Sequence, residues 1–399
     1  MKKLLVIEID GIVDIAKECE KLGWHPIFIQ TESYSDWLPS ENLKENFDIR
    51  TYKELSYFDI VKIIKEEQIQ AVLPISLLEP EGIRDSLVKN YIKNFNLQVT
   101  MVANSPVTME TTFDKWLTKE VLSNANIPVT AGKLIHSGQE QIKINDFFEF
   151  PVIVKERKSF TGKGIRIIHN QESFDKYLTK NCEKKLFIEP FIKGAELSME
   201  VISWKGKKIF QPLVYKGETR INILEHPAYR PRISPFKKGS TLEKKIIAMV
   251  NKAVDVLFLE GASEFEFIII DGEPFIMEIN PRISGITKLC NAAGGVNVYK
   301  ELTNISITDS ISSNYGKEEK YALQLPLSVL PEGKFLNKLE KNPHVKYIKP
   351  ISWMPILPIK SNVIISYAST DKLYEGMMEL EQYSHVRYIE EAKRAFENF

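Results

Sequence analysis

The chain has little cysteine, no excess charge of either sign and no long hydrophobic run. Its three cysteines, Cys19, Cys182 and Cys290, are far apart and lack the spacing of metal ligands, which favours reduced thiols in a cytoplasmic protein over a disulfide framework. With 53 basic and 53 acidic residues the formal net charge is +0, so no field draws the whole chain to nucleic acid or to an anionic membrane. No apolar run approaches the ~20 residues that cross a bilayer. Any phosphate site must therefore be local.

The N-terminal part of the chain predicts an α/β unit. A chain of 399 residues with 43% apolar content is expected to form two or three domains. Leu4 to Ile9 is typical of a strand, Ile12 to Leu22 of an amphipathic helix and Pro26 to Gln30 of a second strand, which predicts an open parallel sheet. Further buried strands are expected at Ala71–Ile75 and Val99–Ala103. No Gly-x-Gly-x-x-Gly motif follows the first strand, so a dinucleotide site, and with it a dehydrogenase, is disfavoured.

The segment from Gly261 to Arg282 predicts a β-hairpin with an acidic face. Two runs rich in Phe and Ile flank an Asp-Gly turn signal, and side chains two apart share one face of a strand. A three-residue loop that begins at Asp271 would place Glu266 opposite Glu278 and diagonal to Asn280. Two carboxylates and an amide oxygen would then converge.

This oxygen-rich set favours a bound cation. Two like charges at that distance are costly unless a cation lies between them, and oxygen ligands suit Mg²⁺ rather than zinc. Glu264 shares the face of Glu266 and is the alternative first ligand. An exposed hairpin with solvated glutamates is the simpler alternative for this segment taken alone.

The hairpin resembles the metal-binding hairpin of the ATP-grasp superfamily, which includes biotin carboxylase, D-alanine:D-alanine ligase and the L-amino-acid ligases. Glu266 and Glu278, twelve residues apart, match the two acidic ligands of that family, and Asn280 matches its asparagine. The resemblance implies ATP and two Mg²⁺ ions, or Mn²⁺ in their place, as cofactors. It also implies that Glu278 bridges the two ions and that Arg282 stabilises the oxyanion in acyl transfer.

The resemblance implies an α/β (α+β) protein with the ATP-grasp fold and three parts. Residues 1–104 are expected to form an N-terminal α/β domain with an open parallel sheet. Residues 105–300 are expected to form the ATP-grasp domain, with a mobile lid at about 130–193, and residues 301–399 a C-terminal α/β subdomain. The motif matches themselves run only from Lys115 to Arg282.

A second motif predicts a phosphate-binding flap. A strand ending in Lys155 leads into a loop with Gly162 and Gly164 and then another strand, which provides a fixed cation and backbone N–H groups that can approach phosphate. In the ATP-grasp pattern the strand lysine binds the α-phosphate region and adenine, and Lys115 matches the earlier phosphate lysine. The charged residues 156–158 depart from the family pattern, which leaves the loop geometry open. A surface role for Lys155 is the alternative.

A third motif predicts an adenine slot. A strand, a short linker and another strand between Leu186 and Glu200 can sandwich a base between apolar walls. By the resemblance, Glu189 recognises adenine, Phe191 and Ile192 supply backbone contacts and apolar walls, and Glu196 holds the ribose hydroxyls.

The substrate is the least constrained part of the prediction. Ser284 and Gly285 resemble the stretch after the metal strand in L-amino-acid ligases, where small residues open space for an aminoacyl group. His226, Arg230 and Arg232 are candidates for binding a substrate carboxylate or phosphate, although each alone is more often a surface ion pair or a hydrogen-bonded histidine.

Together these motifs predict an ATP-dependent, ADP-forming carboxylate:amine ligase similar to the dipeptide-forming L-amino-acid ligases, with Arg282, Lys155 and Glu278 as catalytic residues. Its partners would be small-molecule carboxylates and amines, with no nucleic acid or membrane, in a cytoplasmic protein that could form a homodimer. The alternatives are a carboxylase-type enzyme of the same fold that uses bicarbonate and a catalytically silent ATP-binding protein.

Overall fold

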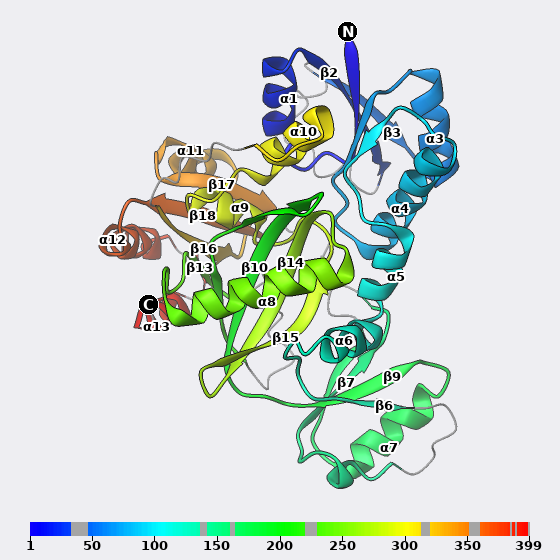
Figure 1. Cartoon of the computed structure of the whole chain (residues 1–399). Helices are drawn as coiled ribbons and strands as arrows, with labels where there is room; N and C mark the ends of the chain where they lie inside the picture. The colour runs from blue at the N-terminus through cyan, green and yellow to red at the C-terminus, as the bar shows by residue number, and fades with distance from the viewer. Residues whose placement is uncertain are drawn as a thin grey trace.

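The computed structural model describes most of the chain as three β-sheets with helices packed on them (Figure 1). The described residues are 1–32, 47–135, 142–159, 164–219, 230–312, 320–350, 360–383, 385–387 and 389–397. Gly162 and His226, which the sequence singled out, lie outside these ranges.

The N-terminal sheet is fully parallel, with strand order β3-β2-β1-β4-β5. Its strands are β1 (Lys2–Ile7), β2 (Trp24–Thr31), β3 (Asp48–Tyr52), β4 (Ala71–Pro74) and β5 (Thr100–Met101). The helices that accompany it are α1 (Ile12–Lys21), α3 (Tyr57–Glu66) and α4 (Glu79–Asn94). The expected parallel sheet is confirmed. The first strand ends two residues earlier than expected, because Glu8 has φ 70°, a left-handed conformation that a strand cannot continue through.

Two helices lead from this sheet to a small antiparallel one. They are α5 (Pro106–Phe113) and α6 (Lys115–Asn124). The small sheet has the order β6-β9-β7-β8, with β6 (Lys133–Ile135), β7 (Val152–Glu156), β8 (Ile165–Ile168) and β9 (Leu186–Pro190). The 3₁₀ turn η2 (Ile144–Asp146) and helix α7 (Gln171–Lys180) complete this lobe, and Phe174 of α7 is fully buried in its core. Figure 1 shows the lobe projecting at the end of the molecule opposite the N-terminal sheet.

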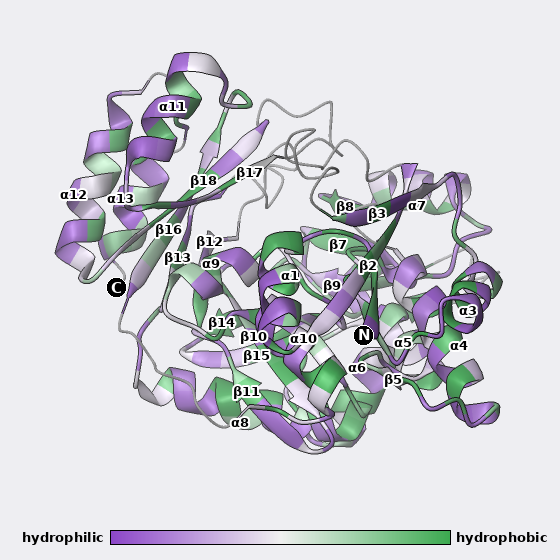
Figure 2. Cartoon of the chain, turned by 90° about the horizontal axis from the view of Figure 1, so that it is seen from above, coloured by the Kyte–Doolittle hydropathy of each residue, from purple (hydrophilic) through white to green (hydrophobic). Residues whose placement is uncertain are grey.

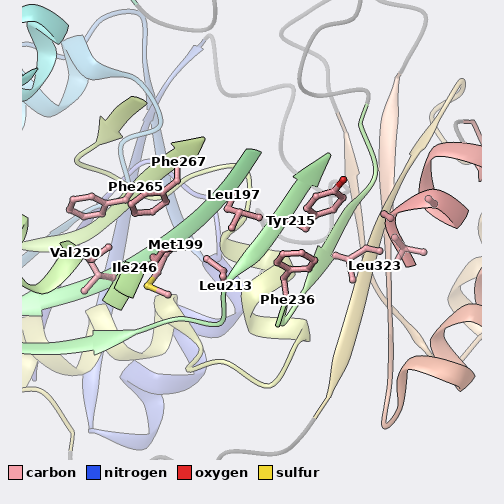
Figure 3. Close-up of a cluster of buried hydrophobic side chains, with 14 of the residues drawn as sticks. Leu197, Met199, Leu213, Tyr215, Phe236, Ile246, Val250, Phe265, Phe267 and Leu323 are labelled. Carbon is pink, nitrogen blue, oxygen red and sulfur yellow. The ribbon is translucent and has the colours of Figure 1, made fainter. Parts of the chain in front are cut away.

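The largest sheet has nine strands and supplies the main core. Its order is β15-β14-β10-β12-β13-β16-β18-β17, with β11 paired to β10. The strands are β10 (Ala195–Trp204), β11 (Lys207–Phe210), β12 (Val214–Glu218), β13 (Arg232–Ser234), β14 (Gly261–Ile270), β15 (Glu273–Asn280), β16 (Tyr321–Leu327), β17 (Val345–Pro350) and β18 (Ser361–Tyr367). Helix α8 (Thr241–Leu257) covers one face, where Val250 lies in one buried cluster with Leu197, Met199 and Phe265 (Figure 3).

The C-terminal strands extend this same sheet, because β16 pairs with β13 and β18 pairs with β16. The remaining helices are α9 (Thr287–Ala292), α10 (Val298–Thr308), α11 (Gly333–Lys341), α12 (Thr370–Glu381) and α13 (Ile389–Glu397). α12 and α13 carry both hydrophobic and hydrophilic residues (Figure 2), and Leu373, Met377 and Ala392 are buried against the sheet. α10 instead returns to pack beside α1 on the N-terminal unit. No helix in the described ranges is long and apolar enough to cross a membrane.

Candidate active site

The hairpin of β14 and β15 has the predicted pairing, reached by a different turn. Glu266 pairs with Glu278, and Asn280 pairs with Glu264, diagonal to Glu266. The expectation of a three-residue loop is wrong. The turn has only two residues, Asp271 and Gly272, both with positive φ (51° and 81°), as a type I′ turn requires. A bulge after Glu266 shifts the register by one residue and restores the acidic pair.

Glu264 and Glu266 occupy different surroundings. The Glu264 side chain is nearly fully buried, and its Oε1 accepts a hydrogen bond from Ser198 Oγ at 2.5 Å. The Glu266 side chain is 23% exposed, and its Oε1 lies 3.4 Å from Asn280 Nδ2. Burial, together with the nearby charges of Glu264 and Glu278, raises the pKa of Glu266 despite its ion pair with Lys216. The more open Glu266 is thus the better placed of the two for an incoming cation.

Two lysines form ion pairs with the acidic residues of the hairpin. Lys115 Nζ lies 3.0 Å from Glu278 Oε1, and Lys216 Nζ lies 2.9 Å from Glu266 Oε1. Burial disfavours the charge on Lys216, but Glu266 and Glu264 more than offset it and raise its pKa. Among the described residues, no group of three or more histidine, cysteine or acidic side chains is arranged to hold a metal ion. The donor types of Glu266, Glu278 and Asn280 nevertheless fit Mg²⁺, with the lysines as the present counter-charges.

A second ionic cluster lies between the small sheet and α6. Glu189 of β9 accepts Lys155 Nζ of β7 at 2.5 Å and Lys119 Nζ of α6 at 2.6 Å. Thr130 Oγ1 donates to the same carboxylate at 2.9 Å. Burial opposes ionisation of Glu189, yet Lys155 and Lys119 hold its pKa below the usual range. Burial lowers the pKa of Lys119, whereas the interaction with Glu189 overcomes burial and raises that of Lys155.

The other predicted nucleotide residues lie around this cluster. Phe191 and Ile192 follow β9, and the Phe191 amide donates to Pro151 O at 3.0 Å, so this N–H is already used within the protein. Glu196 Oε2 lies 2.9 Å from Arg230 Nη1. Gly164 has φ 71°, and a β-carbon there would collide with the Glu156 side chain, so the loop requires glycine at this position.

Of the predicted substrate residues that the structure describes, Arg232 lies on β13, Arg230 lies two residues before that strand, and Ser284 and Gly285 follow β15. Arg232 is buried, which lowers its pKa, while Glu264 and Glu266 oppose that effect. A β-carbon at Gly285 would lie 2.8 Å from Arg232 Nη1, so glycine lets the arginine approach the backbone. The Ser284 amide donates to Thr287 Oγ1 at 3.0 Å.

Arg282 lies at the edge of the hairpin face and is held from the N-terminal unit. Its Nη2 lies 3.5 Å from Asn280 Oδ1. Its Nε and Nη2 donate to Glu79 Oε1 at 3.1 and 2.8 Å. A cavity of about 50 Å³ next to Arg282 is also lined by Ser76, Asp85 and Asn104. The boundary between the two units therefore contains polar groups beside the hairpin.

Residues 112–286 match the protein family described as the ATP-grasp domain. The chain contains an ATP-grasp domain. The matched range includes both ionic clusters and the hairpin, and it leaves out Glu79. Enzymes of this family use ATP with Mg²⁺, which agrees with the donor set of Glu266, Glu278 and Asn280.

The sequence relatives and structural neighbours of this ATP-grasp chain include several ligases and a carboxylase. A carbamoyl-phosphate synthase from Methanobrevibacter smithii is 26% identical over 274 residues, which cover 67% of this chain and 72% of that protein. Large chains of carbamoyl phosphate synthase from Clostridium species also match, and the chain spans only 23% to 28% of their length.

Solved structures share the fold at low sequence identity. An L-amino acid ligase from Bacillus licheniformis superposes with a TM-score of 0.74 at 17% identity, covering 97% of this chain and 99% of that one. The biotin carboxylase domain of 2-oxoglutarate carboxylase from Hydrogenobacter thermophilus gives a TM-score of 0.72 at 18% identity, with coverage of 97% and 91%. The expected ATP-grasp fold is thus confirmed.

Three residues of the two ionic clusters and of the contact with Arg282 escaped the sequence analysis: Lys119, Lys216 and Glu79. Lys119 lies four residues after Lys115 on α6, so the two share a helix face, and this spacing could have pointed to it. Lys216 interrupts an apolar strand, which is a weaker indication. Nothing in the sequence near Glu79 indicates that it contacts Arg282.

Proposed function

We propose that this protein is an ATP-dependent carboxylate:amine ligase that joins two amino acids through an acyl phosphate and releases ADP and phosphate. The observation that carries the proposal is the hairpin face. It combines the Glu266–Glu278 pair and Asn280 with a lysine at 3.0 Å from Glu278 and with Arg282 beside Asn280. Acidic ligands, a phosphate lysine and an arginine within one small region are what phosphoryl transfer to a carboxylate requires.

The nucleotide site of this proposal is built from the flap and the small sheet. Glu266, Glu278 and Asn280 would hold Mg²⁺, which would neutralise the triphosphate. Lys115 and Lys155 would contact phosphates under a flap that includes Gly162 and Gly164. Glu189, Phe191 and Ile192 would line the adenine slot, and Glu196 would meet the ribose. Because both oxygens of Glu189 already bind lysines, recognition of adenine by its side chain would need one of these ion pairs to open.

The chemistry has two balanced steps. An oxygen of the donor carboxylate attacks the γ-phosphorus of ATP, and the bond to the bridging oxygen breaks to release ADP. The amine nitrogen of the second substrate then attacks the acyl carbon, phosphate leaves with the carbon–oxygen electron pair, and the nitrogen loses a proton. Arg282 would face the negative oxygen that develops in the second step. Arg230, Arg232, His226, Ser284 and Gly285 are the proposed surroundings of the substrate.

The small sheet would act as a lid over the nucleotide. We propose the boundaries 1–104, 105–300 and 301–399 for the three parts, with the lid at about 130–193. A flap with glycines must open to admit ATP and close for reaction. Hydrogen exchange with and without a non-hydrolysable ATP analogue tests this: we expect slower exchange in the lid with the analogue, and equal exchange in both states would contradict lid closure.

A second candidate function is a carboxylase-type reaction with bicarbonate. It is favoured by the similarity to the Hydrogenobacter thermophilus biotin carboxylase domain, whose structure was solved in complex with MgADP and bicarbonate. The low identity supports the shared fold only, so this remains the alternative.

Amino-acid pairs screened for phosphate release separate the two candidates. With a suitable amino acid, ATP and Mg²⁺, we expect ADP to form and added hydroxylamine to trap the activated carboxylate as a hydroxamate. Arg282→Ala should strongly reduce hydroxamate formation and leave a low residual rate. Release of AMP would contradict an acyl phosphate, and ADP release with bicarbonate but with no amino acid would replace the ligase by the carboxylase.

A further inference from the structure

The contact between Glu79 and Arg282 joins two units that are distant in sequence. Glu79 is the first residue of α4 in the N-terminal unit, and Arg282 follows β15. The two are separated by 203 residues. Their side chains are 6% and 16% exposed, so the ion pair is largely shielded from water and is stronger than a surface pair.

The position of Glu79 is fixed by its own helix. Glu81 Oε2 accepts hydrogen bonds from the amides of Leu77 and Leu78 at 3.0 and 3.2 Å, which fixes the start of α4. A carboxylate in the first turn of a helix is also stabilised by the helix dipole. The helix start therefore fixes the backbone from which the Glu79 carboxylate reaches Arg282.

The other contacts of Arg282 are weaker. Nη1 donates to Ile283 O at 3.2 Å, and Nη2 lies 3.5 Å from Asn280 Oδ1. Within the described ranges, Glu79 is the one carboxylate at ion-pair distance from Arg282. Two of the three guanidinium nitrogens, Nε and Nη2, donate to a single oxygen of Glu79, which leaves the second N–H of Nη2 and of Nη1 to face another partner. Without Glu79, a long arginine side chain would regain much of its rotamer freedom.

We propose that Glu79 is a positioning residue that holds the Arg282 guanidinium in place for the acyl-transfer step. This inference rests on the proposed function for the role of Arg282. With this role for Glu79, the N-terminal unit takes part in catalysis. Helix α4 orients Arg282, which lies across the domain boundary and stabilises the negative charge that develops in acyl transfer. Glu79 acts only through Arg282 and need not touch the substrate.

A double-mutant cycle tests the proposal through hydroxamate formation in the full chain. Glu79→Gln, which keeps an acceptor oxygen, should lower kcat about tenfold, and Glu79→Ala about a hundredfold. KM for ATP should stay within about twofold of the wild type, because neither residue is placed at the nucleotide. In an Arg282→Ala background, Glu79→Gln should have no further effect, since a residue that acts through Arg282 has nothing left to position.

Glu260→Gln is the matched control. Glu260 also joins the two units, through an ion pair with Lys89 of α4, but does not contact Arg282. A general loosening of the domain boundary should affect Glu260→Gln and Glu79→Gln alike. The positioning role predicts native hydroxamate formation for the first and a loss for the second.

A chemical readout keeps the inference testable without any substrate. Phenylglyoxal modification of Arg282, followed by peptide mass spectrometry, should be about threefold or more faster in Glu79→Gln than in the wild type or Glu260→Gln, because the guanidinium is released. Equal rates in all three proteins, or additive losses in the cycle, would overturn the positioning role. If the wild type forms no hydroxamate with any amino acid but the modification rates differ as expected, the proposed function fails while the Glu79 contact stands.

Discussion

Two ionic clusters in this ATP-grasp chain are both built from carboxylates and lysines, yet they differ in how many carboxylates they contain and how exposed these are. Between the small sheet and α6, two lysines share the single carboxylate of Glu189, whose side chain is only 4% exposed. On the hairpin, the acids Glu264, Glu266 and Glu278 lie together, and the side chains of Glu266 and Glu278 are 23% and 29% exposed.

The difference indicates what each cluster can receive. The Glu189 cluster carries a surplus positive charge in a dry position, which suits the electron-rich base and α-phosphate of a nucleotide. In the hairpin cluster Glu266 and Glu278 are the more exposed acids, and under the proposed function a cation would take the place of their lysines. Lys119 pairs with Glu189 and Lys216 pairs with Glu266, so substitution of each lysine tests whether a cation can replace it.

The largest expected effect comes from the exposed acid of the hairpin. Glu278→Ala should reduce turnover at least about a hundredfold, on the order of 3 kcal/mol of transition-state stabilisation, because the proposed bridging ligand and the partner of Lys115 are both lost. ADP release at saturating Mg²⁺ measures the rate, and circular dichroism checks the fold. Glu273→Gln at the exposed end of the same hairpin is the control. A near-native rate for Glu278→Ala would contradict the metal assignment.

The second prediction concerns the exchangeable lysine. Lys216→Met should destabilise the protein by about 3 kcal/mol without Mg²⁺, because the buried Glu264 and Glu266 lose their lysine. Added Mg²⁺ should recover most of the loss, since a cation can take the place of the ammonium. Urea denaturation of the wild type and the variant with and without Mg²⁺ measures this. A loss that Mg²⁺ leaves unchanged would show that the carboxylates do not bind the ion.

The acidic hairpin could be predicted because its information is local. Cross-strand pairing follows from side-chain periodicity and a turn signal within a single segment, so Glu266 and Glu278 were placed opposite each other even though the turn length was wrong. The bulge after Glu266 has no signal in the sequence pattern. The N-terminal parallel sheet could be predicted because its strands are short, buried apolar runs. Lys216 and Glu79 were missed because their charged partners lie on other strands and helices. Remote charge pairing depends on the final fold, which local patterns do not encode.

The third prediction concerns the Glu189 cluster and the lysine Lys119. Lys119→Met should cost about 2 kcal/mol of folding stability, less than a fully broken pair because Lys155 and Thr130 still bind Glu189. Mg²⁺ alone should not restore it, since Glu189 is a single carboxylate that still pairs with Lys155. The measurement is the same urea series as for Lys216→Met. Recovery by Mg²⁺ of both variants to the same extent would mean that the two clusters do not differ as described.

The smallest effect is expected at Glu8, a buried carboxylate that forms no ion pair with a lysine among the described residues. Its nearest cation is Arg84 at 3.8 Å. Burial, together with Glu81 and Asp85, raises the pKa of Glu8 to about 8, whereas Arg84 lowers it only in part. The folded protein thus holds this proton more tightly than the unfolded chain does. Between about pH 4.5 and pH 8 the free energy of unfolding should therefore fall as pH rises, and it should level off above pH 8. Glu8→Gln removes this titration, so at pH 8.5 the variant should gain about 2 kcal/mol relative to its difference from the wild type at pH 6.5. Urea denaturation at both pH values measures the difference, with the exposed Glu54→Gln as control. If the stability difference between Glu8→Gln and the wild type were the same at both pH values, Glu8 would be ionised in the folded protein. Glu8, which has no lysine partner among the described residues, would then be charged as Glu189 is.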